Sequence, residues 1–339
     1  MKVAINGFGR IGRTFFRQAF GSGGIEIAGI NDLTPVDMLS YLLKYDTVYG
    51  RYEKSVETKS EGQKNYLVVD GENVPTFTEK EPEKLPWGDL GVDVVVESTG
   101  VFASAEGAGK HIKAGAKYVV ISAPAEGETS VPHVLVGTNN EDLKKSNIIS
   151  NASCTTNCAG PVAAVMSQNP GIEKALLSTV HAYTATQALV DGPNKKADRS
   201  RAAAQNIIVT TTGAAEATAK ALPELEGIFT GVSIRVPVPA GSIIDFTFVA
   251  KRDVTREEIN EIFIKASKEE RWKGILEVTD EPLVSSDIVK TTAGAIIDLD
   301  HTRVVGGNLV KVFAWYDNEW GYSAMLLREV KEIGKLLEN

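Results

Sequence analysis

The 339-residue sequence is poor in cysteine, with only two, and has no apolar run long enough to cross a bilayer. Two cysteines cannot build a disulfide framework, and so few suit a reducing compartment. A spanning helix takes about 20 consecutive apolar residues, so the missing run argues against a membrane protein. Positive charge is also scarce, because 36 Lys and Arg face 44 Asp and Glu, for a net charge of −8. An acidic chain argues against nucleic acid as the main partner, and we expect a soluble, cytoplasmic protein.

The composition that remains is that of an ordinary globular chain, 43% hydrophobic and 24% charged, long enough for two domains. Up to about residue 150, short β-rich runs alternate with helical patterns, which is typical of a parallel sheet covered by helices. Later strand patterns, such as 243–251, are longer and have unequal faces, which favours a mostly antiparallel sheet. We predict an α/β fold, with a Rossmann-type doubly wound domain over 1–153 and an α+β catalytic domain over 154–319. An amphipathic C-terminal helix, 320–339, is expected to pack back on the first domain.

A glycine-rich turn follows the first strand pattern, and its spacing is Gly7-x-Gly9-x-x-Gly12. In the dinucleotide fingerprint the first glycine permits a tight turn, the second lets a pyrophosphate approach the backbone, and the third lets the helix pack on its strand. The pyrophosphate is bound by free N–H groups at the helix N-terminus. The alternative is a glycine-rich turn without a ligand.

Asp32 ends a second strand pattern about 20 residues after the last of these glycines. A carboxylate at this place accepts hydrogen bonds from an adenosine ribose and repels a 2′-phosphate, which favours NAD over NADP. A helix cap or turn residue is the other interpretation of Asp32. The strand and helix patterns around the glycines favour the dinucleotide site.

Both cysteines fall in the segment Ser153-Cys154-Thr155-Thr156-Asn157-Cys158, ahead of an Ala- and Val-rich helical pattern. Cys154 is therefore expected at a helix N-terminus, where the dipole and N–H groups stabilise a thiolate and lower the pKa of the thiol below about 8.5. Cys158 falls inside the helix and is interpreted as a small buried hydrophobe. No further Cys or nearby His completes a metal site, so we expect no metal.

A nucleophilic thiol needs a base, and the chain has four histidines. His181 ends an apolar strand pattern and precedes a polar run, which makes it a candidate base, although a structural histidine remains equally open. His111 falls in a helical stretch expected to be exposed. His133 and His301 fall in polar, loop-like contexts, and none of these three is expected to act in catalysis.

Taken together, these motifs resemble those of the phosphorylating glyceraldehyde-3-phosphate dehydrogenases of the bacterial and eukaryotic type. The resemblance covers essentially the whole chain, and its segments are 6–13, 97–102, 122–124, 152–158, 212–215 and 315–319. It implies an NAD-dependent homotetramer of glycolysis and gluconeogenesis. The implied reaction converts glyceraldehyde 3-phosphate and inorganic phosphate to 1,3-bisphosphoglycerate, through a thiohemiacetal and a thioester of the cysteine.

The resemblance also implies residue roles, with Cys154 as the nucleophile and His181 as its base. Implied cofactor contacts are Gly7, Gly9, Arg10, Ile11, Gly12, Asp32, Lys80, Thr99, Ser122 and Asn318. Implied contacts to the two phosphates are Ser153, Thr155, Thr184, Arg199, Thr212, Gly213 and Arg235. Lys80 stands where many relatives carry Arg, and 136–140 departs from the usual end of that strand. Pro193 resembles the NAD-preferring members.

Three alternatives stay open. An erythrose-4-phosphate dehydrogenase shares the fold, the thiol and the cofactor, and its substrate differs by one hydroxylated carbon. An aspartate-semialdehyde or acylphosphate reductase shares a Rossmann domain and a cysteine but usually prefers NADPH. An inactive binding protein of the same fold would have lost the thiol or the base, and Cys154 and His181 are both present.

Overall fold

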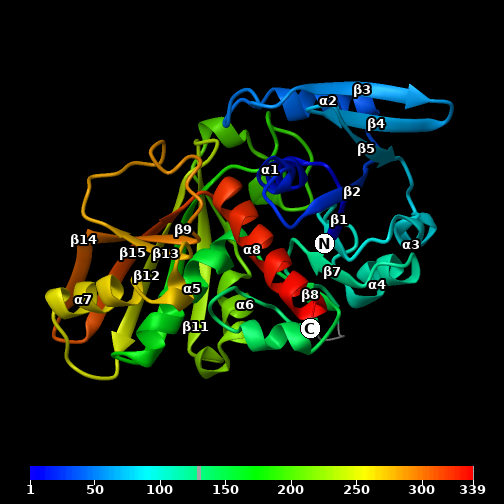
Figure 1. The fold of residues 1–339 in the computed structure, drawn as a ribbon. Helices are drawn as coiled ribbons and strands as arrows, with labels where there is room; N and C mark the ends of the chain where they lie inside the picture. The colour runs from blue at the N-terminus through cyan, green and yellow to red at the C-terminus, as the bar shows by residue number, and fades with distance from the viewer. Residues whose placement is uncertain (128–130, 339) are drawn as a thin grey trace. The chain divides into compact units, whose positions relative to one another are not determined.

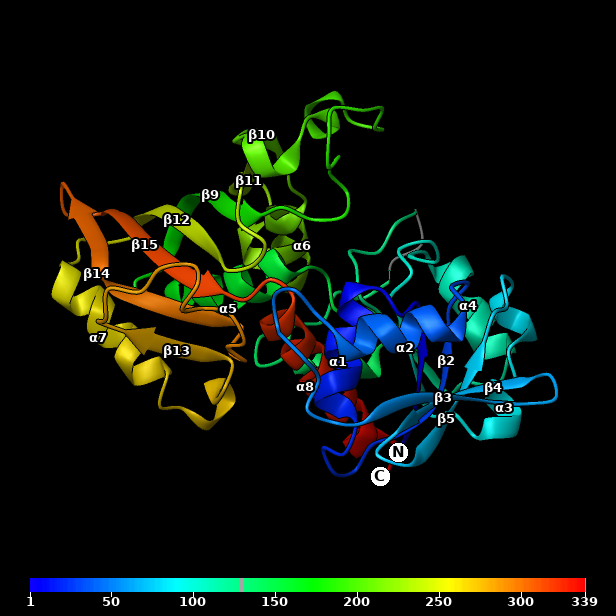
Figure 2. The same cartoon turned by 90° about the horizontal axis from the view of Figure 1, so that it is seen from above.

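The computed structural model describes residues 1–127 and 131–338, and the chain divides into two compact units. The first unit comprises Met1–Val134, Glu141–Ala152 and Leu326–Asn339, and the second comprises Leu135–Asn140 and Ser153–Met325. Each unit has its own sheet, drawn as arrows in Figures 1 and 2. Each also has its own apolar core.

The first unit is built on an eight-stranded sheet with the order β3-β4-β5-β2-β1-β6-β7-β8. From β5 to β8 in this order all neighbours are parallel, whereas β3, β4 and β5 form antiparallel pairs at one edge. The strands are β1 (Lys2–Asn6), β2 (Glu26–Asn31), β3 (Val56–Glu61), β4 (Lys64–Val69), β5 (Glu72–Phe77), β6 (Val94–Glu97), β7 (Tyr118–Ile121) and β8 (Ile148–Ser150). The helices are α1 (Arg10–Ala19), α2 (Val36–Lys44), α3 (Trp87–Leu90) and α4 (Ala105–Lys113).

The central strands of this sheet are apolar on both faces, as parallel strands between helices must be. On β1, Val3 and Ile5 join one apolar cluster with Phe16 of α1, while Ala4 joins another with Trp87 of α3. The predicted Rossmann-type domain is confirmed. The antiparallel pairs of β3 to β5 were not predicted, because β3 is polar and exposed along almost its whole length.

The second unit contains a seven-stranded sheet with the order β10-β11-β9-β12-β15-β14-β13. The pairs β9–β11 and β13–β14 are parallel and the other four are antiparallel, so the predicted mostly antiparallel sheet is confirmed. The strands are β9 (Ile172–Ala182), β10 (Ile208–Thr211), β11 (Phe229–Val236), β12 (Ser242–Ala250), β13 (Leu276–Thr279), β14 (Ala295–Val305) and β15 (Leu309–Tyr316). The helices are α5 (Cys154–Gln168), α6 (Ala214–Ala221) and α7 (Arg256–Ala266).

One face of this second sheet carries the core. Ile244, Phe246 and Phe248 alternate along β12 and are buried in the same cluster as α5, which is buried along most of its length. In Figure 1 the yellow helix α7 lies beside β13 and β14, and its Ile259 and Phe263 enter that cluster. Alternation with a period of two therefore gives the sheet its unequal faces.

The last helix, α8 (Trp320–Leu337), is divided between the units, with residues from Leu326 onward in the first. Leu326, Val330 and Ile333 enter the cluster that holds Val3 and Ile5. Position 339, the end of the predicted helical segment, lies outside the described residues. In the described ranges, every helix is too short or too polar to serve as a membrane span.

The segment 136–140, which departs from the family pattern, belongs to a loop of the second unit, Leu135–Asn140. Gly137 has a positive φ of 80°, and its N–H donates to Asn140 Oδ1 at 2.7 Å. Asn139 Oδ1 accepts from Leu135 N–H at 2.9 Å, and the Arg271 guanidinium donates to the Gly137 and Thr138 carbonyls. Side chains of the segment and of Arg271 therefore bond the backbone of this loop.

Candidate active site and cofactor pocket

The glycine-rich loop is shaped as the dinucleotide fingerprint requires. Gly7 has a φ of +91°, and a Cβ there would lie 2.7 Å from the Thr99 nitrogen. A Cβ on Gly12 would lie 2.1 Å from the Gly7 carbonyl oxygen, so only glycine lets helix and strand approach this closely. A Cβ on Gly9 would meet nothing within 4 Å. Open space in front of Gly9 is what a pyrophosphate needs.

Helix α1 begins directly after this loop, with Gly9 as its N-cap and no side chain bonded to the first turn. The backbone N–H groups of the first turn, at Arg10 and Ile11, are anion ligands of the kind expected at a helix N-terminus. The Arg10 side chain points elsewhere, since its guanidinium pairs with Asp46 and lies 5.5 Å from the ring centre of Tyr49. Any Arg10 contact to a cofactor phosphate therefore comes from its backbone.

A pocket of about 370 Å³ opens at the carboxyl ends of β1, β2 and β6. Gly7, Gly9, Asp32, Lys80 and Thr99 of the expected cofactor contacts line it. Ligands bind at this edge of doubly wound sheets. The residues therefore fit a dinucleotide, with glycines for the pyrophosphate and a carboxylate for the ribose.

Asp32 has a second task in the same loop. Its Oδ2 accepts from Phe8 N–H at 2.7 Å, and its Oδ1 accepts from Thr34 N–H at 2.9 Å. The turn role and the ribose role, which the sequence posed as alternatives, are thus compatible in one side chain. A carboxylate has about four acceptor positions, so two remain for a ribose.

Five expected cofactor contacts are not in the lining of this pocket: Arg10, Ile11 and Gly12 at the start of α1, and Ser122 and Asn318 elsewhere. The Ser122 N–H donates to the Glu97 carbonyl at 2.9 Å, directly after β7. Asn318 belongs to the second unit, where its Oδ1 accepts from Ser242 Oγ at 2.9 Å.

The thiol and the histidine meet in the second unit. Cys154 is the first residue of α5, and the Ser153 Oγ caps the helix by accepting from Thr156 N–H at 3.1 Å. Cys154 Sγ lies 3.2 Å from His181 Nε2, at the end of β9. His181 Nδ1 lies 2.6 Å from the Ala182 carbonyl oxygen. The Ala182 carbonyl, which only accepts, is much nearer to Nδ1 than Arg235 Nη1 is at 3.2 Å. We therefore assign the ring proton to Nδ1, so that Nε2 faces the sulfur as an acceptor.

The pKa of the Cys154 thiol differs from the expectation. Burial raises the pKa of the Cys154 thiol, while the Arg235 guanidinium acts in the opposite direction. The expectation of a lowered pKa is thus wrong, because the desolvation of the thiol exceeds the effects of the helix terminus and of the guanidinium. Burial, and then the charge of Arg235, lower the pKa of His181 to about 3. The resting pair is therefore a neutral thiol beside a neutral imidazole.

Two arginines and a threonine surround the histidine. Pairing of β9 with β11 puts Arg235 beside His181, and Arg235 Nη1 lies 3.2 Å from Nδ1. The same Nη1 donates to Thr184 Oγ1 at 3.4 Å. Arg199 Nη1 donates at 3.1 Å to Thr186 Oγ1, which lies 2.8 Å from Thr184 Oγ1. Arg199, Thr184 and Arg235 therefore form one cationic, hydroxyl-rich cluster, suited to a phosphate.

The other expected phosphate contacts lie at two helix N-termini. Ser153 and Thr155 flank the thiol, and Thr155 Oγ1 lies 2.9 Å from Tyr316 OH. Gly213 is the N-cap of α6, and the Thr212 Oγ1 accepts from the N–H of Ala214, in the first turn, at 3.2 Å. The two helices are in contact. Free N–H groups and hydroxyls make both termini anion ligands.

Sequence reasoning missed several residues of these sites. Tyr316 joins Thr155 to Thr179, and Thr186 joins Arg199 to Thr184. Their signals were present, since Tyr316 falls in the 315–319 segment and Thr186 in the polar run after His181. Within residues 1–127 and 131–338 there is no group of three or more His, Cys, Asp or Glu that could hold a metal ion.

Cys158 and the other three histidines have surroundings that differ from those of the Cys154–His181 pair. Cys158 is fully buried in the core of the second unit, which confirms its interpretation as a hydrophobe. His111 was expected to be exposed, and this is wrong, because it is fully buried against Trp87 and Glu97. His133 is also buried, whereas His301 is exposed on β14.

Comparisons with known proteins agree with this geometry. The model of the glyceraldehyde 3-phosphate dehydrogenase NAD binding domain matches residues 1–105, and that of the C-terminal domain matches 153–318. The chain is 47% identical over 340 residues to glyceraldehyde-3-phosphate dehydrogenase 2 of Streptomyces avermitilis, covering 99% of both chains. It is 50% identical to glyceraldehyde-3-phosphate dehydrogenase 1 of Nostoc, covering 95% of this chain and 94% of that one. It is 48% identical to the Geobacillus stearothermophilus enzyme, covering 95% of both. A nucleotide-binding sheet with the fingerprint loop, a thiol paired with a histidine, and these matches along nearly the whole chain lead to one conclusion: the chain belongs to the glyceraldehyde-3-phosphate dehydrogenase family.

Proposed function

We infer that this enzyme carries out the reaction of its family, the NAD-dependent oxidation and phosphorylation of glyceraldehyde 3-phosphate to 1,3-bisphosphoglycerate in glycolysis and gluconeogenesis. The observation that carries the inference is the 3.2 Å contact between Cys154 Sγ and His181 Nε2 at the start of α5. A thiol with a hydrogen-bonded base is the arrangement required for covalent catalysis on an aldehyde.

The first step that we assign to these residues is attack on the aldehyde. His181 Nε2 takes the thiol proton, the sulfur bonds to the aldehyde carbon, and the proton passes to the former carbonyl oxygen. The product is a neutral thiohemiacetal, with His181 neutral again. Since Nδ1–H is bonded to the Ala182 carbonyl, the imidazole is held in the tautomer that accepts at Nε2.

The second step is oxidation of the thiohemiacetal. His181 Nε2 removes the hydroxyl proton while the C–H bond breaks and its electron pair leaves as hydride, which gives a thioester. When bound, NAD supplies the hydride acceptor. An inorganic phosphate oxygen then attacks the thioester carbon, the C–S bond breaks, and the sulfur leaves as a thiolate that takes a proton from His181. A thioester retains the reactivity that this transfer needs.

Both phosphates are anions in an acidic protein, so local donors have to outweigh the net charge. We assign Arg199, Thr184 and Arg235 to one phosphate, and Ser153, Thr155, Thr212 and Gly213 to the other. The planar, permanently charged guanidinium groups match phosphate oxygens in pairs. Arg235 also contacts His181, so the same side chain links the anion site to the base.

For the cofactor, we propose that the pocket of the first unit holds NAD, with the pyrophosphate on the N–H groups of Arg10 and Ile11 and the ribose on Asp32. Gly7, Gly9, Gly12, Lys80 and Thr99 shape or line this site, and Ser122 and Asn318 are proposed as further contacts to NAD. We also propose domain boundaries of 1–153 and 154–319, with the helix from 320 onward as an addition to the first domain.

For assembly and location, we propose a cytoplasmic homotetramer. One support is an apolar surface on the second sheet, where Leu176, Val209 and Val232 are 61%, 65% and 44% exposed. Large exposed apolar patches mark protein interfaces. Both cysteines are free thiols, which suits a reducing compartment. Light scattering of the purified chain, and of a Leu176→Asp variant expected to dissociate, tests the assembly.

The reaction is tested by NADH formation from glyceraldehyde 3-phosphate with and without inorganic phosphate. We expect phosphate-dependent turnover, and a loss of about 10²–10⁴-fold in the hydride step for His181→Asn, as for a missing general base. Higher kcat/KM with erythrose 4-phosphate than with glyceraldehyde 3-phosphate would assign the alternative substrate. Full activity of His181→Asn would remove His181 from the mechanism.

A further inference from the structure

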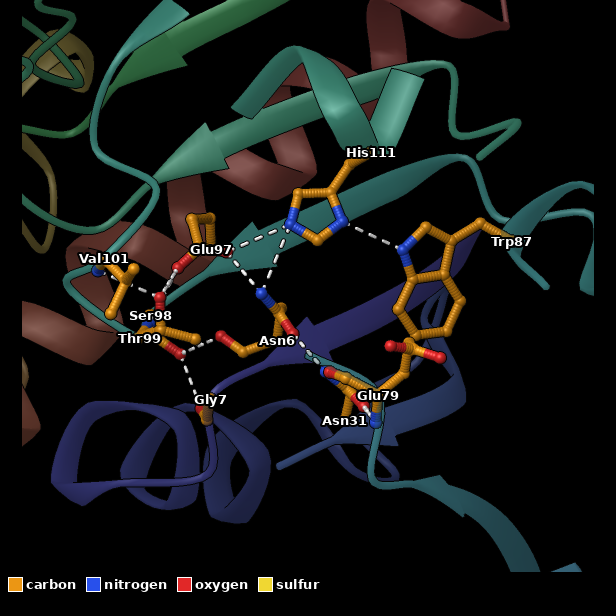
Figure 3. A network of polar contacts seen from close by, with 10 residues as sticks. All are labelled: Asn6, Gly7, Asn31, Glu79, Trp87, Glu97, Ser98, Thr99, Val101 and His111. Atoms are coloured by element: carbon orange, nitrogen blue, oxygen red, sulfur yellow. Dashed lines mark hydrogen bonds and ion pairs between the residues drawn. The ribbon is translucent and has the colours of Figure 1, made fainter. Parts of the chain in front are cut away.

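A buried polar network lies behind the cofactor pocket, and none of the proposed chemical steps uses it. His111 of α4, Trp87 of α3 and Glu97 at the end of β6 are its inner members, and each is at most 2% exposed. Figure 3 shows that the three side chains point toward one another, with Asn6 and Thr99 beside the carboxylate. All of these residues belong to the first unit.

The network fixes which ring nitrogen of His111 carries the proton. Trp87 Nε1–H can only donate, and it lies 3.0 Å from His111 Nδ1, so Nδ1 accepts. The proton of the neutral ring is therefore on Nε2, which donates to Glu97 Oε2 at 3.0 Å. Asn6 Nδ2 also donates to Oε2, at 2.5 Å. His111 thus accepts from the indole of Trp87 at Nδ1 and donates to the carboxylate of Glu97 from Nε2.

The Glu97 carboxylate is held entirely by neutral donors. Oε2 accepts from His111 and Asn6, and Oε1 accepts from the N–H of Thr99 at 2.8 Å and from its hydroxyl. Among the described residues, no Lys or Arg contacts this carboxylate. Burying a carboxylate without a cation costs stability that an apolar side chain of similar size would not cost. Stability of the core therefore does not account for this network.

The residues at the outer end of this network line the pocket. Thr99, Asn6, Asn31 and Glu79 all line it. Asn6 Oδ1 accepts from Asn31 Nδ2 at 2.7 Å, and Asn31 exchanges hydrogen bonds with the Glu79 backbone, both at 2.9 Å.

One further wall residue touches the histidine directly. The ring of Phe102, also in the lining, meets the His111 ring edge to face at 6.4 Å between centres. Through Glu97 and this contact, His111 is connected to two sets of residues in the lining of the same pocket.

We propose that His111 is a positioning residue for NAD, holding the Glu97 carboxylate so that the pocket walls are in place before the cofactor enters. The inference rests on the proposed NAD pocket. Walls that are already ordered spare the cofactor the cost of ordering them, so the network acts on affinity and leaves the chemistry at Cys154 alone. His111 itself touches neither the cofactor nor the reacting atoms.

Four variants test this in the full chain. His111→Leu removes both hydrogen bonds, His111→Gln retains an amide donor for Glu97, and Trp87→Phe removes only the donor to Nδ1. Tyr118→Phe is the matched control, because it deletes one buried hydrogen bond on β7, to the Leu143 carbonyl, away from the pocket. The readouts are the calorimetric Kd for NAD, kcat at saturating NAD, the rate of Cys154 alkylation and ¹⁵N spectra of the histidines.

We expect His111→Leu to raise the Kd for NAD about tenfold, with kcat and the alkylation rate within about twofold of wild type. His111→Gln should recover most of this affinity, and Tyr118→Phe should leave it unchanged. The wild-type spectrum should show His111 protonated at Nε2, and Trp87→Phe should mix the two tautomers with a smaller rise in Kd. If His111→Leu does not fold, the Kd values for NAD of His111→Gln and Trp87→Phe decide whether His111 positions the pocket.

An unchanged Kd in the folded His111 variants, or an equal loss in Tyr118→Phe, would overturn the positioning role while leaving the NAD pocket intact. Absence of NAD binding by the wild-type chain would overturn the proposed pocket and this role together. Protonation of His111 at Nδ1 in the wild type would contradict the tautomer on which the argument depends.

Discussion

The charge of Arg235 affects the pKa of both reacting groups, Cys154 and His181, and a substitution can remove it. Its guanidinium lies 3.2 Å from His181 Nδ1, lowers the pKa of His181 and also lowers the pKa of Cys154. Arg235→Gln removes the charge and keeps a polar side chain of similar length. Both the imidazole and the thiol should then bind their protons more tightly.

The size of the effect on His181 follows from its pKa of about 3. This is about 3.5 below the usual 6.5, which corresponds to about 5 kcal/mol against the imidazolium. Burial is the larger cause and the charge of Arg235 is the second, while the bond to the Ala182 carbonyl acts in the opposite direction. Arg235→Gln should thus raise the pKa of His181 by part of this difference and leave it below 6.5, because the burial remains. A phosphate dianion bound to Arg235 should act in the same direction, so substrate binding strengthens the base.

The assay is a pH titration of ¹⁵N-labelled histidine, which is tractable because the chain contains only four. Alkylation of Cys154 by iodoacetamide against pH follows the thiol, and its profile should move to higher pH in Arg235→Gln. Arg235→Lys is the matched control, since it keeps the charge and should keep the low pKa of His181. Superimposed titrations of wild type and Arg235→Gln, for both groups, would refute the assignment of these shifts to Arg235.

Cys154→Ser should abolish NAD reduction, by several orders of magnitude, while leaving the Kd for NAD unchanged; turnover above about a tenth of wild type would contradict this. Asp32→Asn should improve NADP use relative to NAD and keep the bond to Phe8 N–H, whereas Asp32→Gly should also weaken NAD binding; equal kcat/KM ratios in wild type and Asp32→Asn would assign the preference elsewhere. Burial raises the pKa of the Glu329 carboxyl, which contacts Asn151, so the folded state retains its proton to higher pH than the unfolded state does. The stability that this proton contributes is therefore complete below about pH 4.3 and declines as the pH rises. Glu329→Gln should therefore raise the Tm at pH 8 by about 2–4 °C, with a smaller difference at pH 4; the same difference at both pH values would show that the carboxyl does not titrate on unfolding.

Features encoded within a few consecutive residues could be predicted from the sequence. The glycine fingerprint, Asp32 at the end of the next strand and the start of a helix at Cys154 all depend on local spacing, as backbone turns and helix termini do. The apolar runs and alternating patterns likewise predicted a parallel and a mostly antiparallel sheet. Element ends differed from the predicted ones by a few residues, and the polar strand β3 was missed because it has no apolar pattern.

Tertiary structure decided what surrounds each of those residues. The sequence left His181 equally open as a base or a structural histidine, and the folded chain puts it 3.2 Å from the sulfur and beside Arg235 through the pairing of β9 with β11. Folding also reversed two expectations. The pKa of Cys154 was expected to be lowered and burial raises it, and His111 was expected to be exposed and is enclosed by Trp87 and Glu97. Desolvation and charge depend on neighbours far away in the sequence, which no local pattern contains. The residue types of the site were therefore set by the sequence, whereas their protonation and partners were set only by folding.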